Sequence, residues 1–202
     1  MLGKTHLAVG TAVTLTVLQP DTVPKLIIGL GASIIGAVIS DIDVGSSQAS
    51  REANKIIAIS ILTVIAIILM ESFGHIGVIK VIQNNSDWTR LCIGMVGFIT
   101  VCIFGKMQPH RSFMHSLLAL AILSVLVVLI LPVAAPYFAL AFATHLITDL
   151  FNFKKVRLLY PLPGGVCFKM FHARGIANGI LFTIGSVVTA LSACMCVWNI
   201  IH

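Results

Sequence analysis

Residues 110–115 hold the densest group of side chains that could do chemistry, because His110, Arg111 and His115 lie within six positions, directly before a long apolar run. Imidazole and carboxylate side chains are suitable ligands for zinc, iron or manganese. A guanidinium beside such ligands can bind a phosphate through two parallel hydrogen bonds. Further imidazoles and carboxylates occur in three other short segments: His6, then Asp41 with Asp43, then His145 with Asp149. The residue types therefore indicate a metal site with an anion-binding arginine.

The composition places these residues in a membrane protein. The chain is 58% hydrophobic and only 10% charged, whereas a soluble domain carries about 25% charged residues. A spanning helix needs about 20 mostly apolar residues. We predict an all-α, polytopic bundle of six to seven transmembrane helices, formed by residues 1–202 as a single domain. The predicted spans are residues 2–18, 25–40, 56–70, 91–105, 116–131, 137–151 and 176–201.

The connections between these spans carry further expectations. Residues 71–90 are predicted to be a loop, and small residues between positions 29 and 37 favour close packing of the second helix on the first. We expect the first helix to be retained, because no small-x-small cleavage pattern precedes residues 19–21. The five cysteines form no CxxC pair and are expected to be small buried hydrophobes.

Counting the spans up and down assigns each connection to one side of the membrane. The side that holds the amino terminus also holds residues 41–55, 106–115 and 152–175, and it carries ten of the thirteen Lys and Arg residues. These ten are Lys4, Arg51, Lys55, Lys106, Arg111, Lys154, Lys155, Arg157, Lys169 and Arg174. The positive-inside rule makes this side cytoplasmic. Because topology alone explains the net charge of +6, no nucleic-acid partner is expected.

The same count brings the potential ligands from four helix ends to one membrane depth. Asp41 and Asp43 end a predicted helix, where carboxylates oppose the helix dipole and a compensating cation would be favourable. His145 and Asp149 are four residues apart, so they share one face of an apolar helix. Charged groups in such a helix are costly and are usually paired or functional. His6, by contrast, would be incidental if it stood alone.

His110 and His115 are five residues apart and would not share a face of one continuous helix. They could converge if His110 lies in the turn before the helix and His115 in its first turn. Seven potential metal ligands then meet, which is more than the three protein ligands that a single catalytic zinc ion usually has. They are His6, Asp41, Asp43, His110, His115, His145 and Asp149. The set suits two metals that share a carboxylate, or one metal with outer hydrogen-bonding partners.

These motifs, in this order, resemble the YdjM-like membrane-bound metal-dependent hydrolases, a bacterial inner-membrane family. The resemblance runs from about residue 5 to residue 161 and rests on Thr5-His6, Ser40-Asp41-Ile42-Asp43, His110-Arg111-Ser112-Phe113-Met114-His115-Ser116, Thr144-His145-Leu146-Ile147-Thr148-Asp149 and Val156-Arg157-Leu158-Leu159-Tyr160-Pro161. It implies the same ligands, with Arg111, and an activity on phospholipids. The chain departs from the family pattern at Ser112 and Met114, at Asn152-Phe153 and near Asn178.

Together, the residues and the resemblance predict a multi-pass inner-membrane hydrolase that uses one or two divalent transition metal ions, which we expect to be zinc. Its substrate would be a phospholipid-like phosphoester, its partners would be membrane lipids, and its site would face the cytoplasm. Arg111 would bind the anion, and Asp43 or His115 would act as general base. The alternative is a non-enzymatic membrane protein, either a metal-ion carrier or a structural interaction module. A carrier should place its ligands nearer the bilayer midplane.

Overall fold

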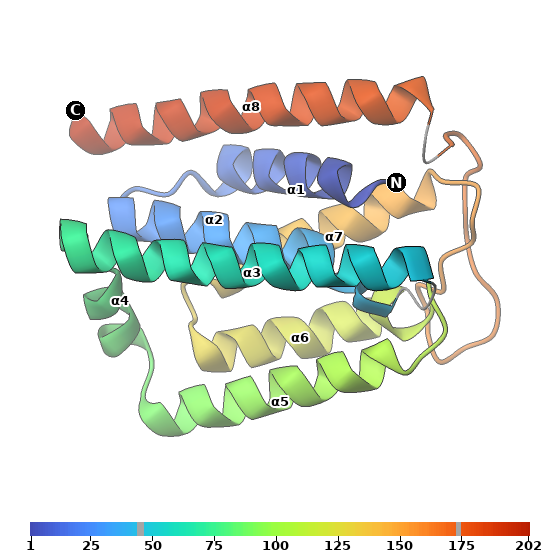
Figure 1. The fold of residues 1–202 in the computed structure, drawn as a ribbon, viewed down its shortest axis with the longest axis horizontal. Coiled ribbons are helices and arrows are strands. Elements are labelled where there is room, and N and C mark those ends of the chain that lie inside the picture. Colours follow the sequence, from blue (N-terminus) through green and yellow to red (C-terminus); the bar gives the residue numbers. More distant parts are fainter. Residues whose placement is uncertain (44–46, 173–174) are drawn as a thin grey trace.

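The computed structural model describes residues 1–43, 47–172 and 175–202, without the side chains of residues 47–57 and 60. The described residues form a helical bundle whose main helices run side by side (Figure 1). The α-helices are α1 (Gly3–Leu18), α2 (Val23–Val38), α3 (Ser47–Gly74), α4 (Val78–Asn85), α5 (Trp88–Lys106), α6 (Leu117–Ile130), α7 (Ala135–Leu150) and α8 (Ile176–Ile201). Two short 3-10 helices, η1 (Ile39–Asp43) and η2 (Phe113–His115), lie at one end of the bundle. The all-α prediction is confirmed.

Each predicted span corresponds to a helix, but the spanning count is lower than predicted. Among the described residues, three helices are long and apolar enough to cross a membrane, namely Val23–Asp43, Trp88–Lys106 and Ile176–Ile201, or four if the pair Ile61–Gly74 and Val78–Asn85 counts as one span. That pair is bent by 111°. The physical reason is length: α1 and α7 have 16 residues and α6 has 14, which gives roughly 21–24 Å against a hydrocarbon core of about 30 Å.

The prediction that residues 71–90 form a loop is wrong, because α4 lies within it. The carboxylate of Glu71 accepts hydrogen bonds from the backbone N–H groups of Gly77, at 3.1 Å, and Val78, at 2.8 Å. Gly77 directly precedes α4 and Val78 is its first residue, so Glu71 stabilises the sharp bend between α3 and α4. Glu71 itself lies inside α3, which continues to Gly74.

Close helix contacts at small residues hold the centre of the bundle together. A side chain at Gly10 would collide with Ala37 of α2, and one at Gly36 would collide with the backbone of Phe138 in α7. The predicted hairpin of the first two helices is therefore part of a larger contact, because α2 packs closely on both α1 and α7. Hydrogen bonds between hydroxyl groups also join α1 to its neighbours. The Ser33 hydroxyl of α2 donates to that of Thr14 at 2.8 Å, and the hydroxyls of Thr11 and of Thr189 in α8 are 3.0 Å apart.

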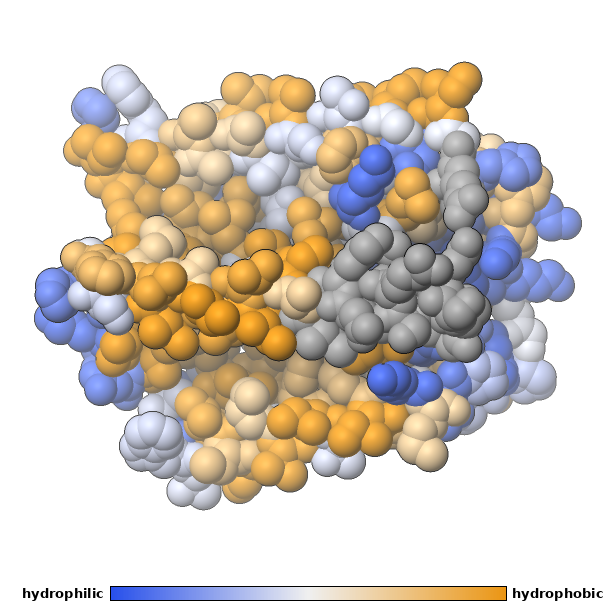
Figure 2. All heavy atoms as spheres, in the orientation of Figure 1, coloured by the Kyte–Doolittle hydropathy of each residue, from blue (hydrophilic) through white to orange (hydrophobic). Residues whose placement is uncertain are grey.

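The outer helices expose apolar faces. Large hydrophobic side chains are exposed along α5 and α8 and along the part of α3 whose side chains are described. The surface shows a broad apolar band with hydrophilic residues gathered towards the two ends (Figure 2). Such a band is what a bilayer covers. The amino terminus and the α7–α8 connection lie at one end of the bundle, and α4 and the carboxyl terminus lie at the other (Figure 1). This matches the predicted up-and-down order.

Candidate metal centre

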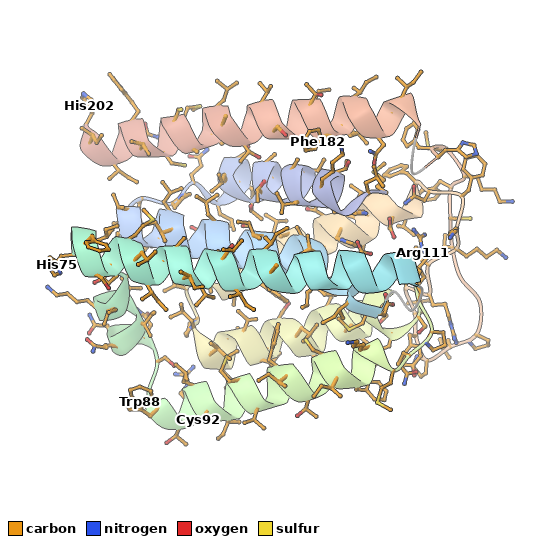
Figure 3. All side chains as sticks on the ribbon, in the orientation of Figure 1. His75, Trp88, Cys92, Arg111, Phe182 and His202 are labelled. Carbon is orange, nitrogen blue, oxygen red and sulfur yellow. The ribbon has the colours of Figure 1, made fainter. Side chains whose placement is uncertain are left out.

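All the sequence-predicted site residues lie at the same end of the bundle, supplied by the start of α1, by η1, by the segment that leads into η2, and by the end of α7. Arg111 marks this end in Figure 3, and His75 and His202 lie at the opposite end. Among the described residues, three groups have ligand atoms within 4.8 Å of one another. They are His6 with His145 and Asp149; Asp41 with His115 and His145; and Asp43 with His110 and His115.

Two carboxylates and three imidazoles form the inner part of this cluster. Nε2 of His6 lies 3.2 Å from Oδ1 of Asp149, and Nε2 of His115 lies 3.5 Å from Oδ2 of the same residue. Oδ1 of Asp41 lies 3.5 Å from Nε2 of His115 and 3.6 Å from Nε2 of His145. We call these five residues the inner cluster. All are buried except Asp41, whose side chain is 17% exposed.

In His6 and His145, the other ring nitrogen has a hydrogen-bond partner that determines which nitrogen carries the proton. Nδ1 of His145 lies 2.6 Å from the carbonyl oxygen of Ala37 and must donate to it, since a carbonyl can only accept. The Thr148 hydroxyl donates to the carbonyl of His145, at 2.9 Å. Its oxygen is therefore the acceptor for Nδ1 of His6, also at 2.9 Å. In both rings, Nε2 is left as a lone pair directed into the inner cluster.

His115 has no such hydrogen bond, but its Nδ1 faces a carboxylate. Its Nδ1 lies 3.4 Å from Oδ2 of Asp43, which leaves Nε2 facing Asp41 and Asp149. An imidazole held by a carboxylate on one nitrogen and facing a cation with the other is a recurrent arrangement in zinc proteins. Burial lowers the pKa of His115, but the nearby carboxylates of Asp149, Asp41 and Asp43 outweigh burial and raise the pKa well above its usual value. These carboxylates therefore favour a positive charge at this position, carried either by a proton on the imidazole itself or by a cation in its place.

Several polar atoms of the inner cluster have no hydrogen-bond partner among the described residues. They are Nε2 of His6 and His145 and both ring nitrogens of His115, all of them buried. Buried polar atoms are normally satisfied, and a lone pair that faces a carboxylate is repelled by it. Tetrahedral ligand atoms about 2.1 Å from a zinc ion stand roughly 3.4 Å apart, close to the separations of 3.2–3.6 Å found here. The donor set thus fits a transition metal ion.

Asp43 and His110 lie one layer further out. Nδ1 of His110 is 2.7 Å from Oδ1 of Asp43, and the backbone N–H of Arg111 donates to Oδ2 at 3.1 Å. The His110 side chain is 32% exposed, whereas the Asp43 carboxylate is fully buried. Residues two apart in a 3-10 helix point about 120° apart, so η1 can direct Asp41 to the inner cluster and Asp43 to this outer pair.

The local chain path brings His110 and His115 together without a continuous helix. The η2 turn holds His115 before α6 begins, and the Ser116 hydroxyl caps α6 by accepting from the N–H of Ala119 at 3.1 Å. The two imidazoles meet edge to face, with ring centroids 5.2 Å apart. His110 therefore lies before the helix, as expected, whereas His115 lies in its own 3-10 turn rather than in the first turn of the helix.

Arg111 has a backbone conformation that few residues other than glycine adopt, with φ of 66°. Its Nη2 lies 2.9 Å from Oδ2 of Asp149, and its Nη1 donates to the carbonyl of Lys154 at 2.9 Å. Its Nε is buried and has no partner among the described residues. The guanidinium is thus held against the inner cluster with one donor unused, so it could reach an anion bound there.

Sequence reasoning missed several polar groups that support Asp149. The side-chain N–H of Asn152 donates to Oδ1 of Asp149 at 2.6 Å, and the Met1 ammonium lies 2.8 Å from the same oxygen. The side-chain oxygen of Asn178 accepts from the N–H of Leu2 at 3.2 Å, which fixes the start of α1 beside α8. Asn152 lies three residues after Asp149, and that spacing was the available signal. His172, a further histidine at this end, stacks on Phe153 in the α7–α8 loop.

Comparison with known proteins gives one match. The family model described as YdjM inner membrane protein matches residues 1–201. No curated protein and no solved structure matches the chain. Because the match extends over nearly the whole sequence, including every residue of the inner cluster and Arg111, the chain belongs to the YdjM inner membrane protein family.

Proposed function

We propose that the protein is a metal-dependent hydrolase whose active site lies at the cytoplasmic face of the inner membrane and acts on a phosphoester of a membrane lipid. One observation carries the proposal. Three unpartnered imidazole nitrogens surround two carboxylates at ligand-to-ligand distances, and the guanidinium of Arg111 pairs with one of these carboxylates. Family membership agrees with a membrane location.

The inner cluster would hold the metal, and zinc suits its imidazole and carboxylate ligands. A bound metal would lower the pKa of a water molecule and polarise a phosphoryl group. Asp43 would orient His115, with which it is in contact through Nδ1, rather than bind the metal itself. The second possible group, of Asp43, His110 and His115, would be the place for a second ion if two are bound.

Two residues at the edge of the inner cluster would act on the substrate. Arg111 would bind a phosphate oxygen through its unused Nε while its Nη2 stays on Asp149. His110 donates its Nδ1 proton to Asp43, so Nε2 remains available to accept or return a proton as substrate and water react. We therefore assign proton transfer to His110, in place of Asp43 or His115.

The position of the cluster supports a lipid substrate. Its residues come from helix ends rather than from helix midpoints, so a phosphate at headgroup depth would meet Arg111 without leaving the bilayer. A carrier should place its ligands nearer the midplane. Uptake of zinc by sealed vesicles without any phosphoester cleavage would favour that alternative.

The test is hydrolysis in nanodiscs that contain a defined phospholipid, followed by phosphorus NMR. We expect headgroup cleavage that a chelator abolishes and added zinc restores. Arg111→Lys should reduce the rate by roughly a hundredfold, because an ammonium cannot replace a forked guanidinium. His75→Ala, at the opposite end of the bundle, is the matched control. Cleavage that is insensitive to metal, or equally fast in Arg111→Lys, contradicts the proposal.

A further inference from the structure

The loop between α7 and α8, residues 152–172, exposes a combination of side chains that is unusual for a segment surrounded by water. Its exposed large hydrophobic residues are Phe153, Leu159, Leu162, Val166, Phe168 and Met170, several of them more than half exposed. Exposed lysines alternate with them, at Lys154, Lys155 and Lys169. Exposed apolar side chains beside basic ones are typical of segments that lie in a membrane interface.

Hydrogen bonds fix the depth at which the second half of the loop lies. The N–H of Phe168 donates to the carbonyl of Leu150 at 2.7 Å, and the N–H of Met170 donates to the carbonyl of Phe151 at 3.0 Å. Those carbonyls belong to the end of α7. The exposed Phe168 and Met170 therefore lie level with the end of an apolar helix, where hydrocarbon gives way to headgroups in a bilayer.

The charges at this end of the molecule select the kind of membrane surface. The acidic side chains described here are those of Asp41, Asp43 and Asp149, and all three belong to the cluster of imidazoles and carboxylates; Glu52 lies outside the described side chains. The outward-facing charges of the loop are lysines. Basic groups beside apolar ones favour a leaflet rich in anionic lipids.

We propose that the 152–172 loop is an interfacial anchor, which inserts its apolar side chains among the headgroups and upper acyl chains of an anionic leaflet while its lysines contact lipid phosphates. This inference does not depend on the hydrolase function. The loop also connects the membrane surface to Arg111 through two hydrogen bonds. The N–H of Arg157 donates to the carbonyl of Arg111 at 3.1 Å, and the guanidinium of Arg111 donates to the carbonyl of Lys154. The position of the anchor thus affects the position of the arginine.

Quenching of tryptophan fluorescence provides the test. The native Trp88 and Trp198 are replaced by Phe, and a single probe is introduced as Phe168→Trp. The full-length protein is placed in nanodiscs of neutral or anionic phospholipid whose acyl chains are brominated near the headgroup. We expect bromolipid to quench the probe, more strongly in the anionic discs. Changing Lys154, Lys155 and Lys169 to Gln should remove the additional quenching in anionic discs. Lys80→Gln, in α4 at the other end, is the matched control.

Two results would overturn the proposal. If an aqueous quencher reaches the probe and bromolipid does not, the loop projects into water. If both quenchers fail and protection increases with the number of protein copies per disc, a second copy of the chain covers the loop instead. Circular dichroism and elution volume show whether each variant is folded. If Phe168→Trp is misfolded, Met170→Trp takes its place, because Met170 is also exposed and lies at the same depth.

Discussion

The histidines of the inner cluster differ from buried core histidines in the use of their second ring nitrogen. His6 and His145 each donate through Nδ1 to an oxygen that has no other role in the cluster, and each leaves Nε2 facing a carboxylate. A buried structural histidine would be expected to satisfy both nitrogens. The unpaired nitrogens gather at one place, beside the carboxylates of Asp41 and Asp149, and this agreement is the main argument for a cation.

Asp43 and Asp149 are predicted to play different roles at the residue scale. Asp43→Asn should keep the metal but weaken its binding by about 10–100-fold, because the carboxylate orients His115 from outside the inner cluster. Asp149→Asn should abolish binding, since it removes a ligand. Zinc competition titrations of the two variants measure this difference.

The matched control is Asp21→Asn, which removes an exposed carboxylate just before α2 that pairs with Lys25. It should bind zinc like the wild type. Equal and complete loss of zinc in Asp43→Asn and Asp149→Asn would make Asp43 a direct ligand, and unchanged binding in Asp43→Asn would remove its orienting role.

The helix elements determine whether the ligands meet, and the contact between α2 and α7 matters most. Asp41 follows α2 through η1, and His145 lies in α7, with its Nδ1 bonded to the carbonyl of Ala37 in α2. Gly36 precedes this carbonyl, and a Cβ there would meet the backbone carbonyl of Phe138. Any increase in the separation of these helices would therefore also separate Asp41 from His145.

Gly36→Ala is accordingly predicted to destabilise the protein by about 1–3 kcal/mol, because backbone atoms cannot move aside as a flexible side chain can. Its zinc affinity should fall as well. Gly179→Ala in α8 is the control, since a Cβ there meets nothing within 4 Å and alanine is the better helix former. Thermal unfolding in detergent compares the two. Equal melting temperatures would contradict the tight α2–α7 contact.

The sequence predicted the cluster better than it predicted the helix boundaries. Polar residues in apolar surroundings, such as His145 and Asp149, are costly unless paired, so their types and spacing carried the information. Thr148 and Asn152 were missed because their roles depend on hydrogen bonds that only the folded chain forms. The α4 helix was missed because a Glu after an apolar run is also a common loop signal, and its partners, Gly77 and Val78, follow a bend that hydropathy does not report.

At the scale of the whole molecule, seven of the ten basic residues whose side chains are described lie at the end that holds the inner cluster and the α7–α8 loop, and Lys25, Lys80 and Arg90 lie at the other. Arg51, Lys55 and Arg174, which entered the positive-inside count, lie outside the described side chains. We predict that this end faces the cytoplasm and that the carboxyl terminus is periplasmic. Alkaline phosphatase fused after His202 should be active, whereas green fluorescent protein at the same position should not fluoresce. The reverse pattern would place the site on the periplasmic face.

The central claim is that the inner cluster binds a transition metal, and metal content tests it most directly. The protein, purified with a carboxyl-terminal tag in the absence of chelators, should contain at least one equivalent of zinc or another transition metal by mass spectrometry. His145→Ala should lose this metal, while His202→Ala, at the far end of the bundle, should keep it. Folded wild-type protein that stays metal-free even after dialysis against zinc would contradict the account, as would equal metal content in the wild type and His145→Ala.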